Sequence, residues 1–444
     1  MKLFKRKIYD SILKWKNDNE GRSALLIEGA RRVGKSTIVR EFAEKEYDSY
    51  ILIDFNKVSN DVKNLFDDLM NLDYLFLSLQ TIFNVSLKKR KSVIIFDEVQ
   101  QCPKARQAIK YLVEDGRYDY IETGSLISLI KNTQSITIPS EEKRITMHPM
   151  DFEEFQWATG HNDLTERLEY FWSRKQGLGP AHRSVMRDLR LYMLIGGMPQ
   201  AVAEFIKTND FSKVDSIKRG IIQLYKDDFL KIDESGKLSD LFLSIPSQLS
   251  GNARRFYSSA VIGQQTEGRL MELMHALTDS KTVNACYQCN DPNVGMKLYK
   301  NSSIYKLFVA DTGLFITMVY WDKSYTENII YQKLLSDKLP ANLGYVYENL
   351  VAQILTSLGF ELFYYIWKKD EKHYYEVDFL ISEGFKISPI EVKSSGYLTH
   401  ASLDEFNKKF SSRINREFLV TPKDYLKDGS IIVLPPYLLP IALR

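Results

Sequence analysis

The chain has 444 residues, of which 44% are hydrophobic and 26% are charged, and its formal net charge is +3. These proportions are those of globular proteins, so they exclude a fibrous or mainly disordered chain, and the length suggests roughly two to four domains. A net charge this close to zero neither requires nor excludes a nucleic-acid partner, because acidic surface elsewhere can offset a basic groove.

The chain contains three cysteines, Cys102, Cys286 and Cys289. A small, odd number argues against a disulfide framework and favours a reducing compartment. Cys286 and Cys289 have the spacing of a metal-binding or redox pair. Since no second pair accompanies them, two ordinary thiols near a turn are the favoured interpretation.

The N-terminus is basic, but no apolar stretch follows it, so it does not have the pattern of a signal peptide. No segment approaches the run of about 18 uncharged apolar residues that a membrane helix needs. We therefore expect a cytoplasmic protein with no membrane partner.

Residues 1–160 are predicted to form an α/β domain. The start of the chain has the pattern of a short amphipathic helix, and short apolar strands then alternate with helices. Buried strands that alternate with helices indicate a parallel sheet covered on both faces. We expect strands at 24–28, 50–55, 92–96 and 118–122, and helices at 35–45 and after Pro103.

The rest of the chain is predicted to contain three further segments. Residues 161–235 have few strand-like patterns and are expected to be helical. Residues 236–335 combine short helices with an extended stretch and could form a winged-helix domain. Residues 336–444 have the order helix, strand, strand, helix, which predicts a second α/β domain.

Residues 29–36 read Gly-Ala-Arg-Arg-Val-Gly-Lys-Ser, which is the G-x-x-x-x-G-K-[ST] pattern of a phosphate-binding loop between a strand and a helix. The glycines let the backbone wrap a phosphate, and the helix presents free N–H groups to it. Lys35 is expected to reach the β- and γ-phosphates and Ser36 to bind Mg²⁺. The alternative is a glycine turn before a helix. The residues expected to bind ATP are Gly29, Ala30, Arg31, Arg32, Val33, Gly34, Lys35, Ser36 and Thr37.

Two strand ends farther along the chain supply polar groups for the same site. An apolar run ends in Asp97 and Glu98, and we expect Asp97 to join the Mg²⁺ shell and Glu98 to polarise the attacking water. The next strand ends near Thr123 and Ser125, where a sensor of the γ-phosphate would lie; a simple turn is the alternative. Since no Asn-Lys-x-Asp motif follows, ATP is preferred over GTP.

Six segments of the chain resemble AAA+-type P-loop ATPases of bacteria and archaea, including a family with a C-terminal domain of unknown function and a nuclease-like core. The resemblance implies that Arg144, shortly before a Pro-x-x-Phe-x-Glu-Phe segment, senses or completes the ATP site. It also implies a restriction-endonuclease-like C-terminal domain. It covers nearly the whole chain and rests on residues 29–37, 94–100, 122–125, 149–155, 196–202 and 310–314.

Four C-terminal residues fit the core of a PD-(D/E)XK nuclease. Glu348 lies on a predicted helix, Asp378 on a strand, and Glu391 and Lys393 on a second strand, where period-two alternation points both to one side. Asp378 and Glu391, with Glu348, would bind Mg²⁺, and Lys393 would position or activate the attacking water. The alternative is a hairpin with a surface ion pair, and this fold is often kept for binding after its chemistry is lost.

The overall expectation is an ATP-hydrolysing AAA+-like protein that couples its nucleotide state to a nuclease-like, DNA- or RNA-binding domain. Arg254, Arg255 and Arg269 could contact phosphates, although a solvated helix face is an equal alternative. A second hypothesis is an ATP-switched regulatory or signalling protein, whose inactive nuclease fold acts on a protein partner. Either form could assemble as a homo-oligomer.

Overall fold

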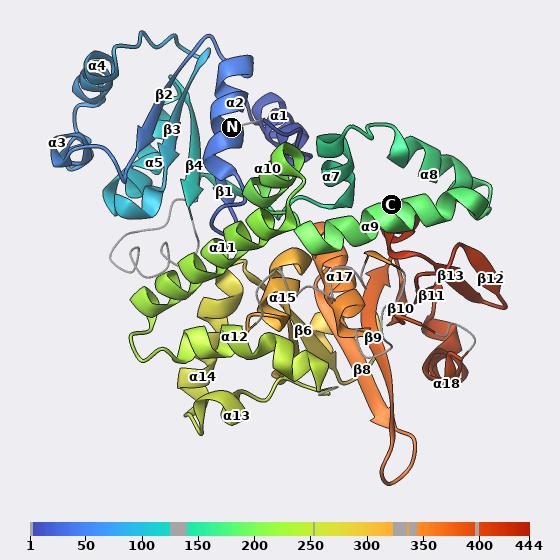
Figure 1. Cartoon of the computed structure of the whole chain (residues 1–444). Coiled ribbons are helices and arrows are strands. Elements are labelled where there is room, and N and C mark those ends of the chain that lie inside the picture. The colour runs from blue at the N-terminus through green and yellow to red at the C-terminus, as the bar shows by residue number, and fades with distance from the viewer. Residues whose placement is uncertain (1–2, 125–139, 252–253, 323–334, 337–343, 396–398) are drawn as a thin grey trace. The chain divides into compact units, whose positions relative to one another are not determined.

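The computed structural model describes residues 3–124, 140–251, 254–322, 335–336, 344–395 and 399–444 (Figure 1). The chain forms two compact units: unit 1 is Met1–His148 with Asp279–Lys281, and unit 2 is Pro149–Thr278 with Thr282–Arg444. In unit 1, Lys281 Nζ lies 3.4 Å from Oε1 of Glu28. Within the described ranges, no helix has the length and apolar character that crossing a bilayer requires.

Unit 1 is built on a five-stranded sheet with the order β2-β3-β4-β1-β5, in which all neighbouring strands run parallel. Every residue of β1, β3 and β4 is buried, as expected of strands covered on both faces. Strand β4 lies between β1 and β3, so the carboxyl ends of these three strands meet at one edge. The strands are β1 (Ala24–Glu28), β2 (Ser49–Asp54), β3 (Ser92–Asp97), β4 (Asp119–Gly124) and β5 (Glu142–Thr146).

The predicted parallel α/β fold of this part of the chain is confirmed. Strand β5 was not predicted because its sequence is mostly polar, and the structure places it at the edge of the sheet, where its residues are half-buried or exposed. The helices of unit 1 are α1 (Ile8–Asn19), α2 (Lys35–Glu46), α3 (Asn60–Asn64), α4 (Leu72–Phe83), the 3₁₀ turn η1 (Val99–Gln101) and α5 (Pro103–Asp115).

Unit 2 contains an eight-stranded mixed sheet with the order β12-β13-β11-β10-β9-β8-β6-β7. The neighbours β6/β7, β8/β9, β9/β10 and β12/β13 are antiparallel, and the others are parallel. The strands are β6 (Val283–Cys289), β7 (Lys300–Val309), β8 (Leu362–Lys368), β9 (Tyr374–Glu383), β10 (Lys386–Val392), β11 (Glu417–Val420), β12 (Leu426–Asp428) and β13 (Ile431–Leu434).

Helices make up most of the chain between the two sheets, as Figure 1 shows in green and yellow. The described helices of unit 2 are α7 (Phe152–Thr159), α8 (Leu164–Ser173), α9 (His182–Ile195), α10 (Pro199–Thr208), α11 (Phe211–Ile232), α12 (Lys237–Ser250), α13 (Ser258–Ile262), α14 (Glu267–Asp279), α15 (Thr312–Val319), α17 (Gly344–Ser357), α18 (Ala401–Phe410) and α19 (Leu439–Ala442).

The segment considered for a winged helix does not stand as a separate domain in the structure. Helices α12, α13 and α14 are followed by the antiparallel hairpin β6–β7, which is the element order of a winged helix. However, β6 also pairs in parallel with β8, so the hairpin completes the large sheet. The predicted segments 161–235, 236–335 and 336–444 therefore belong to one compact unit apart from residues 279–281.

Two glycine-containing motifs of unit 2 serve close packing. A Cβ atom on Gly197 would lie 2.0 Å from the backbone oxygen of Met150, and one on Gly313 would lie 2.5 Å from Cα of Gly196. The buried Asp311 carboxylate accepts a hydrogen bond from the Gly197 N–H at 2.5 Å and caps the start of α15. These contacts explain why segments 196–202 and 310–314 contain glycine at these positions.

Replacing Gly197 with Ala should destabilise unit 2 by about 1–3 kcal/mol, because the added methyl group overlaps the Met150 carbonyl oxygen. The matched control is Gly220→Ala in the middle of α11, where a Cβ meets nothing within 4 Å. This change should stabilise the helix by roughly 0.5–1 kcal/mol. Urea unfolding of both variants measures the difference, and equal stabilities would contradict the packing argument.

Candidate functional site

The phosphate-binding loop connects β1 to α2 and has the backbone shape that an anion cradle needs. Gly29, Arg32 and Gly34 all have positive φ angles, of 156°, 72° and 104°. A Cβ atom on Gly29 would lie 2.3 Å from the Met147 backbone oxygen, so only glycine fits there. The 12-residue helix α2 begins directly after Gly34 and presents its first N–H groups to the loop.

Lys35 lies inside this loop with 6% of its surface exposed. Its Nζ donates hydrogen bonds to the backbone oxygens of Gly29 at 2.9 Å and Ala30 at 3.0 Å. Burial lowers the pKa of Lys35 below its usual value, and the charges of Glu98 and Asp97 partly oppose this effect. A desolvated ammonium held by loop carbonyls is suited to transfer its hydrogen bonds to a phosphate.

Three predicted side chains meet at one carboxylate oxygen at the edge of the sheet. Asp97 Oδ1 accepts hydrogen bonds from Ser36 Oγ at 2.8 Å and from Thr123 Oγ1. Thr123 Oγ1 in turn accepts the backbone N–H of Glu98 at 3.2 Å. A hydroxyl and a carboxylate side by side beside a phosphate cradle form the oxygen donor set that suits Mg²⁺ together with nucleotide phosphates. The residues present therefore fit a magnesium–nucleotide complex.

Two residues of this site were missed by the sequence analysis. Arg6 is buried, and its guanidinium donates to the backbone oxygens of Val33 at 2.9 Å and His148 at 2.6 Å, so it ties the phosphate-binding loop to the chain after β5. Gln100, also buried, donates through Nε2 to Oε2 of Glu98 and so orients the predicted base. Gln100 follows the acidic pair by two residues, so its position in the sequence could have indicated its place in the site. The position of Arg6 in the sequence gives no such indication.

Of the other predicted site residues, one lies outside the described residues and one is not brought to this edge. Ser125 lies outside the described residues. Arg144, on β5, is level with Leu26 in the middle of β1, and its Nε donates to Oε1 of Glu142 at 2.7 Å. Glu142 is the first residue of β5, so the Arg144 guanidinium points back along the strand, away from the strand ends that carry the loop.

Unit 1 also contains a pair of buried acidic side chains, Glu122 on β4 and Glu142 on β5. Glu122 on β4 is fully buried, and neither of its oxygens has a hydrogen-bond donor among the described residues. Burial, and then the adjacent Glu142 carboxylate, raise the pKa of Glu122 well above its usual value. A proton on Glu122 would supply a donor toward Glu142, whose other partners are Arg144 and the buried Arg106, at 2.7 Å and 3.2 Å.

In unit 2, the four carboxylates nearest the predicted nuclease-like centre line one cavity of about 290 Å³. Glu348 comes from α17, Glu376 and Asp378 from β9, and Glu391 from β10. The structure therefore brings together three residues predicted from the sequence and adds Glu376. The remaining residues that line the cavity are Leu249, Lys306, Val392 and Ser402.

These carboxylates are already engaged by groups of the protein. Asp378 Oδ2 accepts the Val392 backbone N–H at 2.7 Å, and Glu391 Oε1 lies 3.3 Å from Nζ of Lys393. Lys393 also donates to the backbone oxygen of Thr399. Burial is the main cause that raises the pKa of Asp378 and of Glu391 above their usual values. Among the residues that the structure describes, no group of three His, Cys, Asp or Glu is arranged to hold a metal ion, so this donor set does not fit Mg²⁺ as it stands.

The cysteines are buried free thiols. Cys286 and Cys289 are three positions apart on one strand, so their side chains start on opposite faces, and the geometry does not make a chelating pair. Burial raises the pKa of the Cys286 thiol well above its usual value, which leaves it protonated and unreactive.

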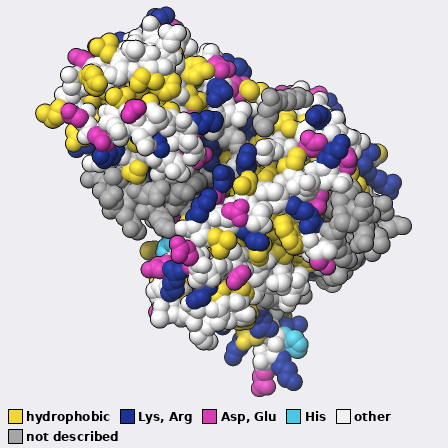
Figure 2. All heavy atoms as spheres, turned by 60° about the vertical axis from the view of Figure 1, so that its left-hand side comes forward, with side chains coloured by type: hydrophobic (Ala, Val, Ile, Leu, Met, Phe, Trp, Pro, Cys, Tyr) yellow, Lys and Arg dark blue, Asp and Glu magenta, His cyan; other side chains and the backbone are white. Residues whose placement is uncertain are grey.

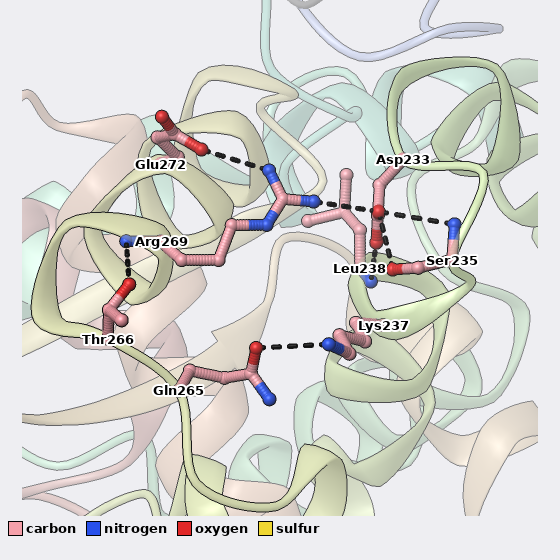
Figure 3. Close-up of polar contacts among 8 residues, drawn as sticks. All are labelled: Asp233, Ser235, Lys237, Leu238, Gln265, Thr266, Arg269 and Glu272. Atoms are coloured by element: carbon pink, nitrogen blue, oxygen red, sulfur yellow. Dashed lines mark hydrogen bonds and ion pairs between the residues drawn. The ribbon is translucent and has the colours of Figure 1, made fainter.

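The three arginines considered for nucleic-acid binding differ in their surroundings. Figure 3 shows Arg269 of α14 between Asp233, at 2.8 Å, and Glu272, at 2.9 Å, so its charge is used within the protein. Arg254 and Arg255 are exposed, and each lies over a tyrosine ring. The distances from guanidinium carbon to ring centroid are 4.0 Å for Arg254 over Tyr374 and 4.9 Å for Arg255 over Tyr257.

Three family models match parts of this chain. Residues 21–156 match the model of an AAA domain, residues 186–325 match a domain of unknown function (DUF8612), and residues 343–438 match another domain of unknown function (DUF4143). Unit 1 is similar to AAA domains. This match, together with the phosphate-binding loop and its convergent Asp97, supports ATP binding and hydrolysis. No curated protein matches the sequence.

Several solved structures are similar to parts of the chain. A Walker-type ATPase of Pyrococcus abyssi is 17% identical over 71% of this chain and 96% of its own, with a TM-score of 0.42. The ORC1 protein of Aeropyrum pernix, in complex with DNA, is 11% identical over 73% and 94%, with a TM-score of 0.27. The RuvB Holliday junction branch migration motor of Thermotoga maritima is 12% identical over 63% and 89%, with a TM-score of 0.28. All three scores are below 0.5, so none of them establishes a shared fold for the whole chain.

Replacing Glu122 with Gln should make unit 1 more stable at high pH. The folded state holds the Glu122 proton more tightly than the unfolded chain does, so wild-type stability falls as the pH rises above the usual glutamate pKa of 4.5. The amide needs no proton, so the variant should gain on the order of 1 kcal/mol at about pH 8 and little at about pH 5.

Urea unfolding at the two pH values measures this difference, with the exposed Glu114→Gln on α5 as the matched control. Identical pH dependence in wild type and Glu122→Gln would show that Glu122 is not the titrating group.

Proposed function

We propose that the chain is a magnesium-dependent ATPase of the AAA+ type, whose nucleotide state controls a nuclease-like unit that binds nucleic acid. The observation that carries the ATPase part is the convergence of Ser36 and Thr123 on one oxygen of Asp97, beside the buried ammonium of Lys35. This constellation comes from three separate strand ends of unit 1, and it has the composition that phosphoryl transfer needs.

Each residue of this site has a separate task in the proposed reaction. Lys35 and the N–H groups at the start of α2 bind and orient the phosphates, and Ser36 and Asp97 would hold Mg²⁺, which neutralises phosphate charge when bound. Glu98 polarises the attacking water, and Gln100 fixes its carboxylate. Thr123 ties the Asp97 side chain to the Glu98 backbone, so it is placed to sense the γ-phosphate.

The nucleic-acid part of the proposal is supported by the two exposed arginine–tyrosine pairs of unit 2. Arg254 and Tyr374 form one pair, and Arg255 and Tyr257 form the other. Stacked guanidinium and aromatic groups can neutralise phosphates and stack on bases. The Tyr364 hydroxyl donates to the Arg254 backbone oxygen at 2.9 Å, and the Tyr364 ring centroid lies 5.4 Å from Nζ of Lys306, which lines the carboxylate-lined cavity.

Near Tyr374, the β8–β9 hairpin ends in a charged turn. Figure 1 shows this hairpin extending from the sheet, and Figure 2 shows basic, acidic and histidine side chains gathered on it. Residues 368–373 are exposed, and Asp370 of this turn is hydrogen-bonded to His373. Because its charges are mixed, the turn extends the arginine–tyrosine surface without forming a purely basic patch.

A protein partner is a second candidate, favoured by an exposed apolar surface on unit 1. Met70 is 94% exposed, and Tyr74 and Leu77 of α4 are 64% and 63% exposed, at helical spacing. Figure 2 shows hydrophobic side chains gathered on the surface of this unit. Exposed apolar side chains on one face of a helix are typical of protein interaction sites.

Lys35→Ala should abolish ATP hydrolysis and weaken ATP binding, because the phosphates lose their buried positive charge. Glu98→Gln should keep ATP binding and reduce kcat at least about 100-fold, because only the water-polarising carboxylate is removed. Steady-state turnover and binding of a fluorescent ATP analogue measure the two effects. Lys45→Ala, at an exposed position on the same helix as Lys35, is the matched control. Wild-type turnover by Glu98→Gln would show that Glu98 is not the base.

The double variant Arg254→Ala/Arg255→Ala should bind nucleic acid more weakly for all sequences. Two lost phosphate contacts should reduce the slope of log affinity against log salt by about 2. Fluorescence anisotropy with labelled single-stranded and duplex DNA at several salt concentrations measures this, and ATP turnover in the absence of DNA should be unchanged.

The matched control for this variant is Arg183→Ala/Arg187→Ala, which removes two exposed arginines from α9. If both double variants bind like wild type, the interface lies elsewhere. If wild type itself does not bind DNA or RNA at low salt, the protein-partner candidate replaces the nucleic-acid one.

A further inference from the structure

Lys306 is a buried lysine inside the carboxylate-lined cavity of unit 2, and it belongs to none of the sequence motifs. It lies on β7 with 7% of its surface exposed. Its Nζ forms an ion pair with Glu376 and lies 4.0 Å from Glu348 and 5.4 Å from the ring centroid of Tyr364. A positive charge of the protein itself is thus held in the centre of the acidic residues.

The surroundings keep this lysine charged. Burial alone would lower the pKa of Lys306, but the carboxylates of Glu376, Glu348 and Asp378 together raise it above its usual value. A buried ammonium is stable only when opposite charges and hydrogen bonds replace its water. The cavity supplies both, so Lys306 and these carboxylates stabilise one another.

Backbone contacts fix the position of Lys306 relative to Glu348. Asn349, the residue after Glu348 on α17, binds both backbone groups of Val309 on β7. Its Oδ1 accepts the Val309 N–H at 2.8 Å, and its Nδ2 donates to the Val309 oxygen at 3.0 Å. These two hydrogen bonds fix the strand that carries Lys306 against the helix that carries Glu348. The distance between Lys306 and Glu348 is therefore set by two regular elements.

The remaining acidic groups of the cavity are also directed to partners other than a metal. Asp378 accepts the Val392 N–H, and Glu391 faces Lys393. In a metal-dependent nuclease, such carboxylates would be balanced by a divalent cation. Here, the ammonium groups of Lys306 and Lys393 pair with them instead.

We propose that the Lys306 ammonium is the permanent cation of this cavity, in the place that a divalent metal ion has in a nuclease, and that the wild-type cavity binds no divalent cation. It follows that unit 2 does not cut nucleic acid by metal-dependent hydrolysis. Removing the lysine should convert the same carboxylates into a cation site, because Glu376 and Glu348 lose their partner and Oε2 of Glu391 already has no hydrogen-bond donor among the described residues. The inference is independent of ATP hydrolysis by unit 1.

The experiment titrates Mn²⁺ into the nucleotide-free, full-length chain and follows both the melting temperature and free Mn²⁺ by electron paramagnetic resonance. Wild type should show no specific site and no shift in melting temperature. Lys306→Ala should bind one Mn²⁺ and gain a few degrees in melting temperature by mass action. The double variant Lys306→Ala/Asp378→Asn should lose both effects. Lys300→Ala, on the same strand but outside the cavity, is the matched control and should behave as wild type.

Two outcomes would overturn the proposal. One is a specific Mn²⁺ site in wild type that Asp378→Asn removes, because the metal would then coexist with the lysine or displace it. The other is a folded Lys306→Ala that binds no Mn²⁺. Should Lys306→Ala fail to fold, Lys306→Met keeps the length and packing of the side chain without its charge and is tested in the same way. The wild-type titration remains decisive in either case.

Discussion

The Asp97 carboxylate is the group on which the organisation of the nucleotide site depends. A single oxygen accepts hydrogen bonds from Ser36, at the start of α2, and from Thr123, near the end of β4. Because β4 lies between β1 and β3, this atom joins the ends of all three central strands. The bend after β1 also restricts this site, because Gly29 lies so close to the Met147 backbone oxygen that no side chain fits there. Under the proposed function, a change in nucleotide state would therefore act on three strands together.

In unit 2, a chain of buried polar side chains performs a comparable task. Gln353 of α17 donates to the Tyr192 hydroxyl at 2.8 Å and accepts the Thr312 N–H at 2.9 Å, which joins α9, α15 and α17. One turn earlier, Asn349 binds the end of β7. Fully paired buried polar groups favour one arrangement over looser alternatives. Through Asn349, this network adjoins Glu348, which lines the carboxylate-lined cavity.

The features of the structure that could be predicted from the sequence are those in which the functional residues lie within a few positions of a recognisable strand pattern. The phosphate-binding loop and the acidic pair each follow an apolar strand, so their positions at the edge of a parallel sheet follow from local pattern. Glu348, Asp378 and Glu391 were also correctly expected to lie together. Lys306 could not be found in this way, because it is 70 residues from Glu376 and lies on the edge strand β7, which β6 and β8 separate from β9 in the sheet.

The path of the chain has a mechanical consequence. Residues 279–281 belong to unit 1, although they run from the last residue of α14 toward β6 of the second unit. Lys281 is 3.4 Å from Glu28, the residue just before the phosphate-binding loop. The polypeptide therefore crosses between the units three times: after His148, after Thr278 and after Lys281. A protease cut after His148 would leave residues 279–281 of unit 1 covalently attached to unit 2, whereas residues 1–148 would be held to them only by non-covalent contacts. A displacement at the end of β1 can therefore pass to residues 279–281 through the Lys281–Glu28 ion pair, and from there along the chain to α14 and β6.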